Sequence, residues 1–285
     1  MIDLKQLDQL AAFASLGTLS AAAEALHTSQ PALSRSMKQL EDELGVSLFV
    51  RSKNHLSLTE TGRKAAEYAA QLLSSAKEYE AKVIAYDRSL HTLSVGFCAP
   101  IPQMVLAPLI SASFSGMTLA FDMTDDARFL ELLDQGFYQL CIVHEAPDDE
   151  RYYYKKCGHE DLYIAVIPQH PLAEKKEVRL SDLDGLSLLL LRDIGFWKKM
   201  HLLKTPHTRY LHQHDLTDFT DIAIHSSYPI FASGYNLKRG DGPVGRVCIP
   251  ILDSEAHTDY YLVCLRSVRS KYEELFRQID ASTVE

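Results

Sequence analysis

The chain has 285 residues, of which 46% are apolar and 24% charged, and its net charge is −9. This mix is typical of folded globular proteins and excludes a largely disordered chain, a collagen and a membrane bundle. The length predicts more than one domain. No apolar run approaches the ~18 residues of a membrane span, no signal peptide is visible, and the five cysteines form no CxxC pair. We therefore expect a cytoplasmic protein with no membrane partner and no disulfide framework.

Charge is unevenly distributed along the chain. Residues 1–90 hold ten Lys and Arg against eleven Asp and Glu, and the remainder carries −8. Within 29–64, six basic residues face four acidic ones. Since an acidic chain is not an obvious nucleic-acid binder, we expect contact with DNA only in this N-terminal segment.

The first 45 residues predict three helices. Apolar residues repeat at helical spacing from Leu4 to Ala14, and Gly17 ends this helix. Ser20 is the expected cap of the second helix, which runs to Leu26. A third helix begins at Ser29 or Gln30, buries an apolar stripe and ends at Gly45. The stripe consists of Leu33, Met37, Leu40 and Leu44.

A short hairpin is predicted next, from Leu48–Arg51 and Leu56–Leu58 around a polar turn. Three helices followed by a hairpin predict a winged helix-turn-helix domain over residues 1–59.

A long helix is predicted over residues 60–90. Apolar residues follow a 4,3 spacing, which is typical of a coiled-coil seam. The seam consists of Ala65, Ala69, Leu72, Ala76, Tyr79, Val83, Tyr86 and Leu90. Packing against the helix's own domain is the alternative, but we favour a linker and dimerisation helix. The expected dimer contacts are Leu72, Ala76, Tyr79, Val83 and Tyr86.

From residue 91 onward, strands alternate with helices, which predicts an α/β domain. The predicted strands are 93–97, 117–123, 140–143, 162–167, 186–191 and 260–265. The predicted helices are 100–113, 129–135 and 271–279.

The sequence resembles the LysR-type bacterial transcriptional regulators. The resemblance is carried by the run Leu19–Arg35, then Leu40-Glu41, Leu44-Gly45, Leu48–Arg51, Leu58-Thr59 and Gly62. A looser similarity to the effector domain of that family covers Glu160–Leu162, His170–Ala173 and Leu180–Leu183.

This resemblance implies a fold and a function. The fold is a winged helix-turn-helix, a linker helix, and a two-subdomain α/β effector domain like type 2 periplasmic binding proteins. We expect the effector domain at 91–285, with subdomain I at 91–161 and 267–285 and subdomain II at 162–266. The function is control of transcription by a homodimer or homotetramer that binds double-stranded DNA, a small-molecule effector and RNA polymerase.

Helical geometry selects the residues expected to contact DNA. With the apolar stripe inward, Pro31, Ser34, Arg35 and Lys38 point outward, and Gln30 lies at the exposed N-terminal end. Gln can pair with adenine and Arg with guanine in the major groove. We also expect wing contacts from Arg51 and Lys53.

Effector contacts are expected at the carboxyl ends of strands, where open α/β sheets bind ligands and where the family resemblance also implies a cleft. The expected residues are Cys98, Ala99, Pro100, Thr124, Asp125, Ile194, Gly195 and Phe196.

Several alternatives remain at this point. Cys98 is a candidate redox sensor, and four histidines between His201 and His214 are a candidate metal sensor. They are His201, His207, His212 and His214. An enzyme or a solute-binding module with a DNA-binding appendage is also possible, but the sequence lacks Walker A, GxGxxG, HExxH and GxSxG motifs. We therefore expect no catalytic residue, no metal and no cofactor.

Overall fold

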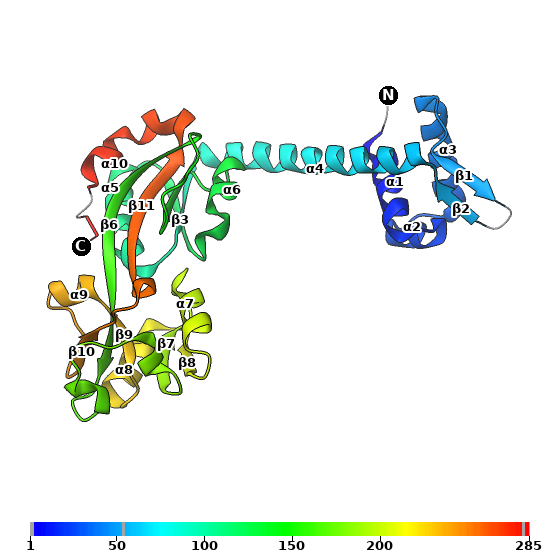
Figure 1. Cartoon of the computed structure of the whole chain (residues 1–285). Coiled ribbons are helices and arrows are strands. Elements are labelled where there is room, and N and C mark those ends of the chain that lie inside the picture. Colours follow the sequence, from blue (N-terminus) through cyan, green and yellow to red (C-terminus); the bar gives the residue numbers. More distant parts are fainter. Residues whose placement is uncertain (1–2, 53–54, 281–282, 285) are drawn as a thin grey trace. The chain divides into compact units, whose positions relative to one another are not determined.

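The computed structural model describes residues 3–52, 55–280 and 283–284. The chain divides into two compact units, Met1–Ile84 and Ala85–Glu285, which we call unit 1 and unit 2 (Figure 1). Among the described residues, no helix is both long and apolar enough to cross a membrane.

Unit 1 consists of three helices, a hairpin and most of a long fourth helix. The elements are α1 (Leu4–Leu16), α2 (Leu19–Ala25), α3 (Gln30–Leu44), β1 (Phe49–Ser52), β2 (His55–Leu58) and α4 (Glu60–Ser89). Helices α1 and α3 end at glycines in the left-handed conformation, as the sequence predicts. Strands β1 and β2 pair antiparallel, which confirms the predicted hairpin.

Two details of unit 1 differ from the prediction. The cap of α2 is Thr18, whose side chain accepts a hydrogen bond from the Ala21 N–H, while Ser20 lies inside the helix. Leu33, Met37 and Leu40 are buried, but Leu44 is 38% exposed because α3 ends there, beyond the core.

Unit 2 is an α/β structure built on nine described strands. They are β3 (Thr92–Phe97), β4 (Thr118–Met123), β5 (Leu140–Val143), β6 (Tyr152–Val166), β7 (Ser187–Leu191), β8 (Arg209–Gln213), β9 (Ile230–Ser233), β10 (Val247–Pro250) and β11 (His257–Leu265). Their order is β4-β3-β5-β11-β6-β9-β7-β8, with β10 beside β6. Parallel and antiparallel pairs are mixed in this sheet.

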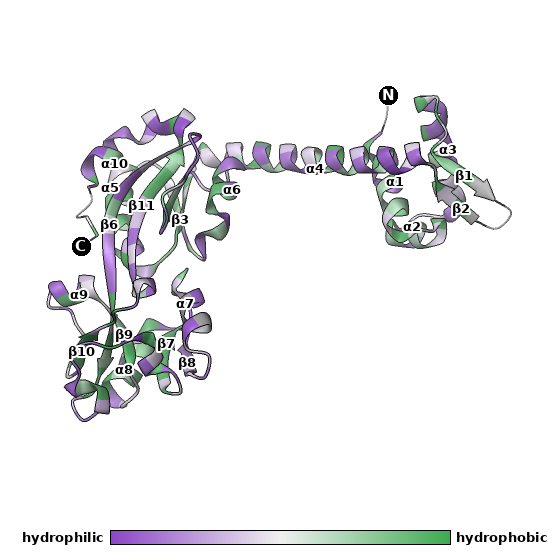
Figure 2. Cartoon of the chain, viewed as in Figure 1, coloured by the Kyte–Doolittle hydropathy of each residue, from purple (hydrophilic) through white to green (hydrophobic). Residues whose placement is uncertain are grey.

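Helices cover the sheet of unit 2. They are α5 (Pro100–Ser113), α6 (Phe129–Asp134), α7 (Trp197–Lys204), α8 (Leu216–His225), α9 (Gly234–Lys238) and α10 (Glu273–Gln278). Short 3-10 segments lie at Asp126–Arg128, Pro171–Glu174, Leu180–Leu183, Ser254–Ala256 and Arg266–Tyr272. Strands β3, β7 and β9 carry mostly hydrophobic residues, whereas β6 is largely hydrophilic before it reaches β9, and α4 mixes hydrophobic and hydrophilic residues along its length (Figure 2).

Strand β6 belongs to both halves of the sheet. Between Tyr152 and Asp161 it pairs with β11 across one register shift, and its last residues, from Leu162, pair with β9 and with β10. Figure 1 shows β6 running from one half of unit 2 into the other. The sequence predicts only 162–167 of this strand, so the prediction misses the part that joins the two halves.

Candidate DNA-binding face and effector site

Helix α3 presents a polar face to solvent. Pro31, Arg35 and Lys38 are exposed, and Ser34 is half-buried beside them. The opposite face of α3 is anchored in the core by Leu33, Met37 and Leu40. The prediction that this face contacts DNA therefore has the geometry that it needs, because the polar side chains point away from the core.

Gln30 lies at the exposed N-terminal end of α3. Ser29 caps the helix by accepting a hydrogen bond from the Ala32 N–H. The Ser20 hydroxyl donates to Gln30 Oε1 at 3.3 Å, so α2 orients the first side chain of α3. Of the expected wing contacts, Lys53 and the side chain of Arg51 lie outside the described residues.

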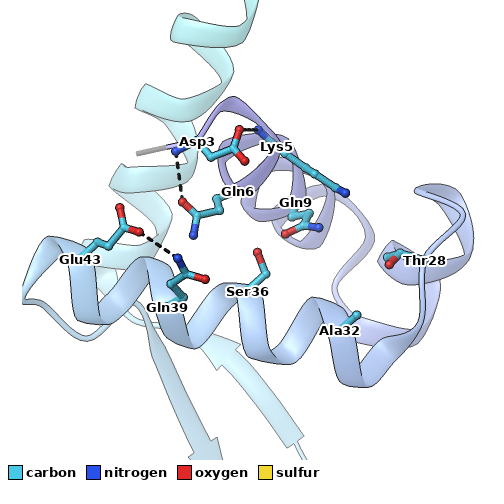
Figure 3. A pocket seen from close by; sticks show the side chains of 9 residues that line it. All are labelled: Asp3, Lys5, Gln6, Gln9, Thr28, Ala32, Ser36, Gln39 and Glu43. Atoms are coloured by element: carbon cyan, nitrogen blue, oxygen red, sulfur yellow. Dashed lines mark hydrogen bonds between the residues drawn. The ribbon is translucent and has the colours of Figure 1, made fainter. Parts of the chain in front are cut away.

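A third face of α3 lines a polar groove against α1 (Figure 3). The groove has a volume of about 290 Å³. Its lining comprises Asp3, Lys5, Gln6, Gln9, Thr28, Ala32, Ser36, Gln39 and Glu43. Gln39 donates to Glu43 at 3.1 Å, and the Asp3 N–H donates to Gln6 Oε1 at 3.2 Å. Because none of the expected DNA contacts lines this groove, it is a surface distinct from the predicted DNA-binding face.

The apolar seam of α4 separates into two parts. Ala69 is buried in the core of unit 1, and Ala65 packs against that core. From Leu72 onward the seam is open: Leu72 is 55% exposed, Tyr79 70%, and Val83 51%. Packing within the domain therefore accounts for the start of the seam only.

The predicted effector residues come together in unit 2, where they form a closed contact. Cys98 and Ala99 are fully buried. The Phe196 N–H donates to the Cys98 carbonyl oxygen at 2.9 Å, and a β-carbon on Gly195 would overlap that same oxygen. The loop 194–196 therefore lies in direct contact with the end of β3.

An ion pair adds a second link between the same segments. Lys199 Nζ lies 2.8 Å from Asp125 Oδ2, so α7 is connected to the segment after β4. Pro100 is half-buried and Ile194 is buried, whereas Thr124 is exposed. Thr124 is held through its backbone, since its N–H donates to the Phe97 carbonyl.

Aromatic stacking also holds the loop. The rings of Phe196 and His144 stack with centroids 4.2 Å apart, and Trp197 lies 4.3 Å from Phe196. His144 Nδ1 lies 2.6 Å from Asp126 Oδ2. Burial lowers the pKa of His144, but the hydrogen bond and charge of Asp126 raise it more, so the net pKa lies above the usual value.

A buried polar cluster beside the loop was missed by the sequence prediction. The Tyr260 hydroxyl donates to the Glu160 carboxylate, and Ser233 and Trp197 also bond to that carboxylate. Burial raises the pKa of Glu160 above its usual value. Only the register between β6 and β11 brings these residues together, and a single sequence does not reveal that register.

Two family profiles match the chain. The bacterial regulatory helix-turn-helix domain of the LysR family covers residues 4–63, and the LysR substrate-binding domain covers residues 87–214. The chain belongs to the LysR family. The predicted family and fold class are therefore confirmed: a LysR helix-turn-helix unit precedes a mixed-sheet α/β unit.

Individual LysR relatives agree with this assignment. The chain is 31% identical over 186 residues to the RuBisCO operon transcriptional regulator of Allochromatium vinosum, covering 64% of this chain and 61% of the relative. It is 28% identical over 198 residues to a hydrogen peroxide-inducible genes activator of Dickeya chrysanthemi, covering 67% and 64%. The matches thus span less than two thirds of each curated relative.

A solved LysR structure shows the same fold. It is a full-length OxyR variant from Pseudomonas aeruginosa, with a TM-score of 0.51, 20% identity and full coverage of both chains.

Since both curated relatives are named as regulators of transcription, the enzyme and solute-binding alternatives have no counterpart among them.

The described side chains do not support the two sensor alternatives, and the side chain of His201 lies outside them. Cys98 is buried, and burial raises its thiol pKa well above the usual range, which opposes formation of the reactive thiolate. His207 pairs with Asp184, and His214 lies against Arg192. The only set of three donor groups that converges among the described residues lies elsewhere, at His159, Asp161 and His257.

Proposed function

We propose that this chain is a sequence-specific DNA-binding transcriptional regulator controlled by a small-molecule effector. The observation that carries the proposal is the exposed face of α3 in a domain that the LysR helix-turn-helix profile matches. Gln30 and Arg35 would read base edges, Ser34 would contact a phosphate or a base edge, and Lys38 would contact a phosphate. Pro31, with Arg51 and Lys53 in the wing, completes the proposed interface.

The regulator is proposed to act as a homodimer or homotetramer through α4. Leu72, Tyr79, Val83 and Tyr86 are all more than half exposed in the single chain. With Ala76, they follow one stripe of the helix, where a second copy of α4 would bury them. Two DNA-binding units held in one assembly would then share the binding of paired half-sites.

Effector control is proposed to act through the contact between the loop 194–196 and Cys98. In the closed state the two segments are in contact, and in the open state they are apart. An effector that separates the segments would bind the open state more tightly, whereas one that contacts both segments would bind the closed state more tightly. Either preference shifts the equilibrium between the two states. The effector residues are proposed as in the sequence analysis, with Asp125 and Phe196 at the edge of the contact.

We also propose the predicted domain boundaries, a cytoplasmic location and contact with RNA polymerase. The exchange of β6 partners at Leu162 supports a subdomain boundary there. The proposed bounds assign β11 to subdomain II, although its strand partners, β5 and residues 152–161 of β6, belong to subdomain I.

The proposal is tested by selecting binding sites from a random-sequence DNA duplex pool with the full chain at near-physiological salt. We expect enrichment of a partly palindromic site, and loss of its binding in Gln30→Ala and Arg35→Ala. Lys238→Ala removes an exposed charge from unit 2 and is the control that keeps binding. Failure to enrich any site, with or without candidate effectors, would contradict the proposal.

A further inference from the structure

Two histidines and two aspartates gather on one face of the β6–β11 pair. His257 lies opposite Asp161, and Asp259 lies opposite His159. Because side chains alternate along a strand, residues 159 and 161 share a face, as do 257 and 259. Glu160, between His159 and Asp161, and Tyr260, next to Asp259, point to the other face, where they form the buried polar cluster.

The four side chains form a continuous chain of contacts. Asp161 Oδ1 lies 2.8 Å from His159 Nε2 and 2.6 Å from His257 Nδ1. The other ring nitrogen of His159, Nδ1, lies 2.8 Å from Asp259 Oδ1. One donor atom from each of His159, Asp161 and His257 lies within 4.8 Å of the other two.

We propose that His159, Asp161 and His257 bind one divalent transition-metal ion, with Asp259 as the residue that orients His159. Two imidazole nitrogens and one carboxylate oxygen suit Zn²⁺, Co²⁺ or Ni²⁺, whereas Mg²⁺ prefers oxygen ligands alone. A carboxylate on the outer nitrogen of a metal-bound histidine fixes the ring and raises its basicity. Asp259 occupies that position on His159.

The side chains have room to accept the ion. Metal–ligand bonds of about 2.0–2.2 Å require the donor atoms to move apart by several tenths of an ångström from their present contacts. Each of the three ligand side chains is about one-third exposed, between 32% and 37%, so small rotations meet no packed core. A groove of about 520 Å³ adjoins His159 and His257 and leaves a further coordination position for water.

The charges around the site favour a cation. Asp161 and Asp259 contribute two negative charges, and Glu145 lines the same groove. Lys156 Nζ lies 2.8 Å from Asp259 Oδ1, so its positive charge is placed against the orienting carboxylate.

The position of the site gives the ion a structural consequence. Asp161 is the last residue of β6 that pairs with β11, and from Leu162 the strand pairs with β9. A bound ion would therefore fasten β6 to β11 where β6 passes from one half of unit 2 to the other. Ligand binding to the folded state alone raises its stability, so the ion should raise the melting temperature.

The test uses the full chain after treatment with a chelator, followed by calorimetric titration with Zn²⁺ and, separately, Mg²⁺. We expect one Zn²⁺ per chain at this site, a higher melting temperature with Zn²⁺, and no effect of Mg²⁺. His257→Ala and Asp161→Asn should each weaken Zn²⁺ binding by more than about tenfold, and Asp259→Asn by about 10–100-fold. His212→Ala, which removes an exposed histidine of β8, is the matched control that leaves the site intact.

A Co²⁺ titration provides a readout independent of stability. The visible absorption of protein-bound Co²⁺ should appear in the parent chain and in His212→Ala, and be lost in Asp161→Asn when that variant melts cooperatively without metal. Equal Zn²⁺ affinity in the parent chain, His257→Ala and Asp161→Asn would overturn the proposal. So would the absence of Zn²⁺ binding, or its loss in His212→Ala alone.

Discussion

At Gly195 the backbone adopts a left-handed conformation with φ of 61°, directly against the Cys98 carbonyl. We predict that Gly195→Ala opens the contact between the loop 194–196 and β3, because a β-carbon cannot fit beside that oxygen. Backbone strain of roughly 1–3 kcal/mol adds to the overlap. Trp197, the only tryptophan, should become more accessible to a fluorescence quencher, and the melting temperature of unit 2 should fall.

Gly185→Ala is the control for this substitution. Gly185 also has a positive φ, of 83°, but nothing lies within 4 Å of its expected β-carbon. It shares the backbone strain without the overlap. Equal effects of the two substitutions on Trp197 quenching would contradict the steric explanation.

His144 should make the stability of unit 2 depend on pH. Its net pKa lies above the usual value, mainly through Asp126 acting against burial, with Glu145 and Asp125 adding negative charge nearby. The stabilisation is complete below the unfolded pKa of about 6.5 and is lost as pH rises through the higher folded value. We predict that the melting temperature falls from about pH 6 to about pH 8, and falls less steeply in His144→Asn.

His212→Asn provides the comparison for the pH series, because this histidine is exposed on β8 and far from Asp126 in sequence. In this variant the melting temperature should fall with pH as steeply as in the parent chain. If it falls as steeply in His144→Asn as well, the Asp126 contact does not contribute to the pH dependence.

Among the secondary-structure elements, α4 offers the clearest test of assembly. We predict that Val83→Asp shifts the chain toward monomer, since it places a charge in the proposed seam. A tenfold weaker association, or about 1.4 kcal/mol, is the minimum expected effect. Sedimentation equilibrium measures it directly. Ser74→Asp, on the opposite side of the helix, should leave the assembly unchanged. A Val83→Asp chain that dimerises as tightly as the parent would contradict the proposal that this seam forms the dimer contact.

The elements predicted correctly are those specified by local pattern. The helices of unit 1 show apolar periodicity with caps such as Ser29, and β5 is an apolar run of four residues with the predicted bounds. The first ten residues of β6 were missed because they are mostly polar or aromatic, with lysines at 155 and 156. They form a strand only because β11, about 100 residues later, pairs with them.

The same long-range pairing explains what was missed in the sites. His159 and Asp161 are close in sequence, but His257 joins them only through the β6–β11 register. The predicted histidine cluster was short in sequence and therefore conspicuous, yet His207 and His214 bond to different partners. The loop 194–196 was assigned to the same predicted effector site as Cys98, and it lies against Cys98 in the structure. The hydrogen bond that closes this contact depends on backbone positions that no motif encodes.

At the scale of the whole molecule, DNA binding should depend on assembly through α4. A second half-site bound in the same complex typically increases overall affinity by about 10²–10⁴-fold. We therefore predict that Val83→Asp loses most of its affinity for a two-half-site duplex and little for a single half-site. Fluorescence anisotropy with both duplexes tests this. Equal losses on the two duplexes would mean that the substitution damages the DNA-binding unit itself.

The continuity of β6 determines how unit 2 can be divided into fragments. Proteases cut chain that is exposed and unpaired, whereas β6 is hydrogen-bonded to neighbours across the junction of the two halves. A recombinant fragment that stops at residue 214, where the family match ends, would lack β9, β10 and β11 and leave both edges of β6 bare. Such unpaired edges promote aggregation. Crystallisation or screening of the effector unit alone therefore requires the chain from about residue 91 through its last helix, in one piece.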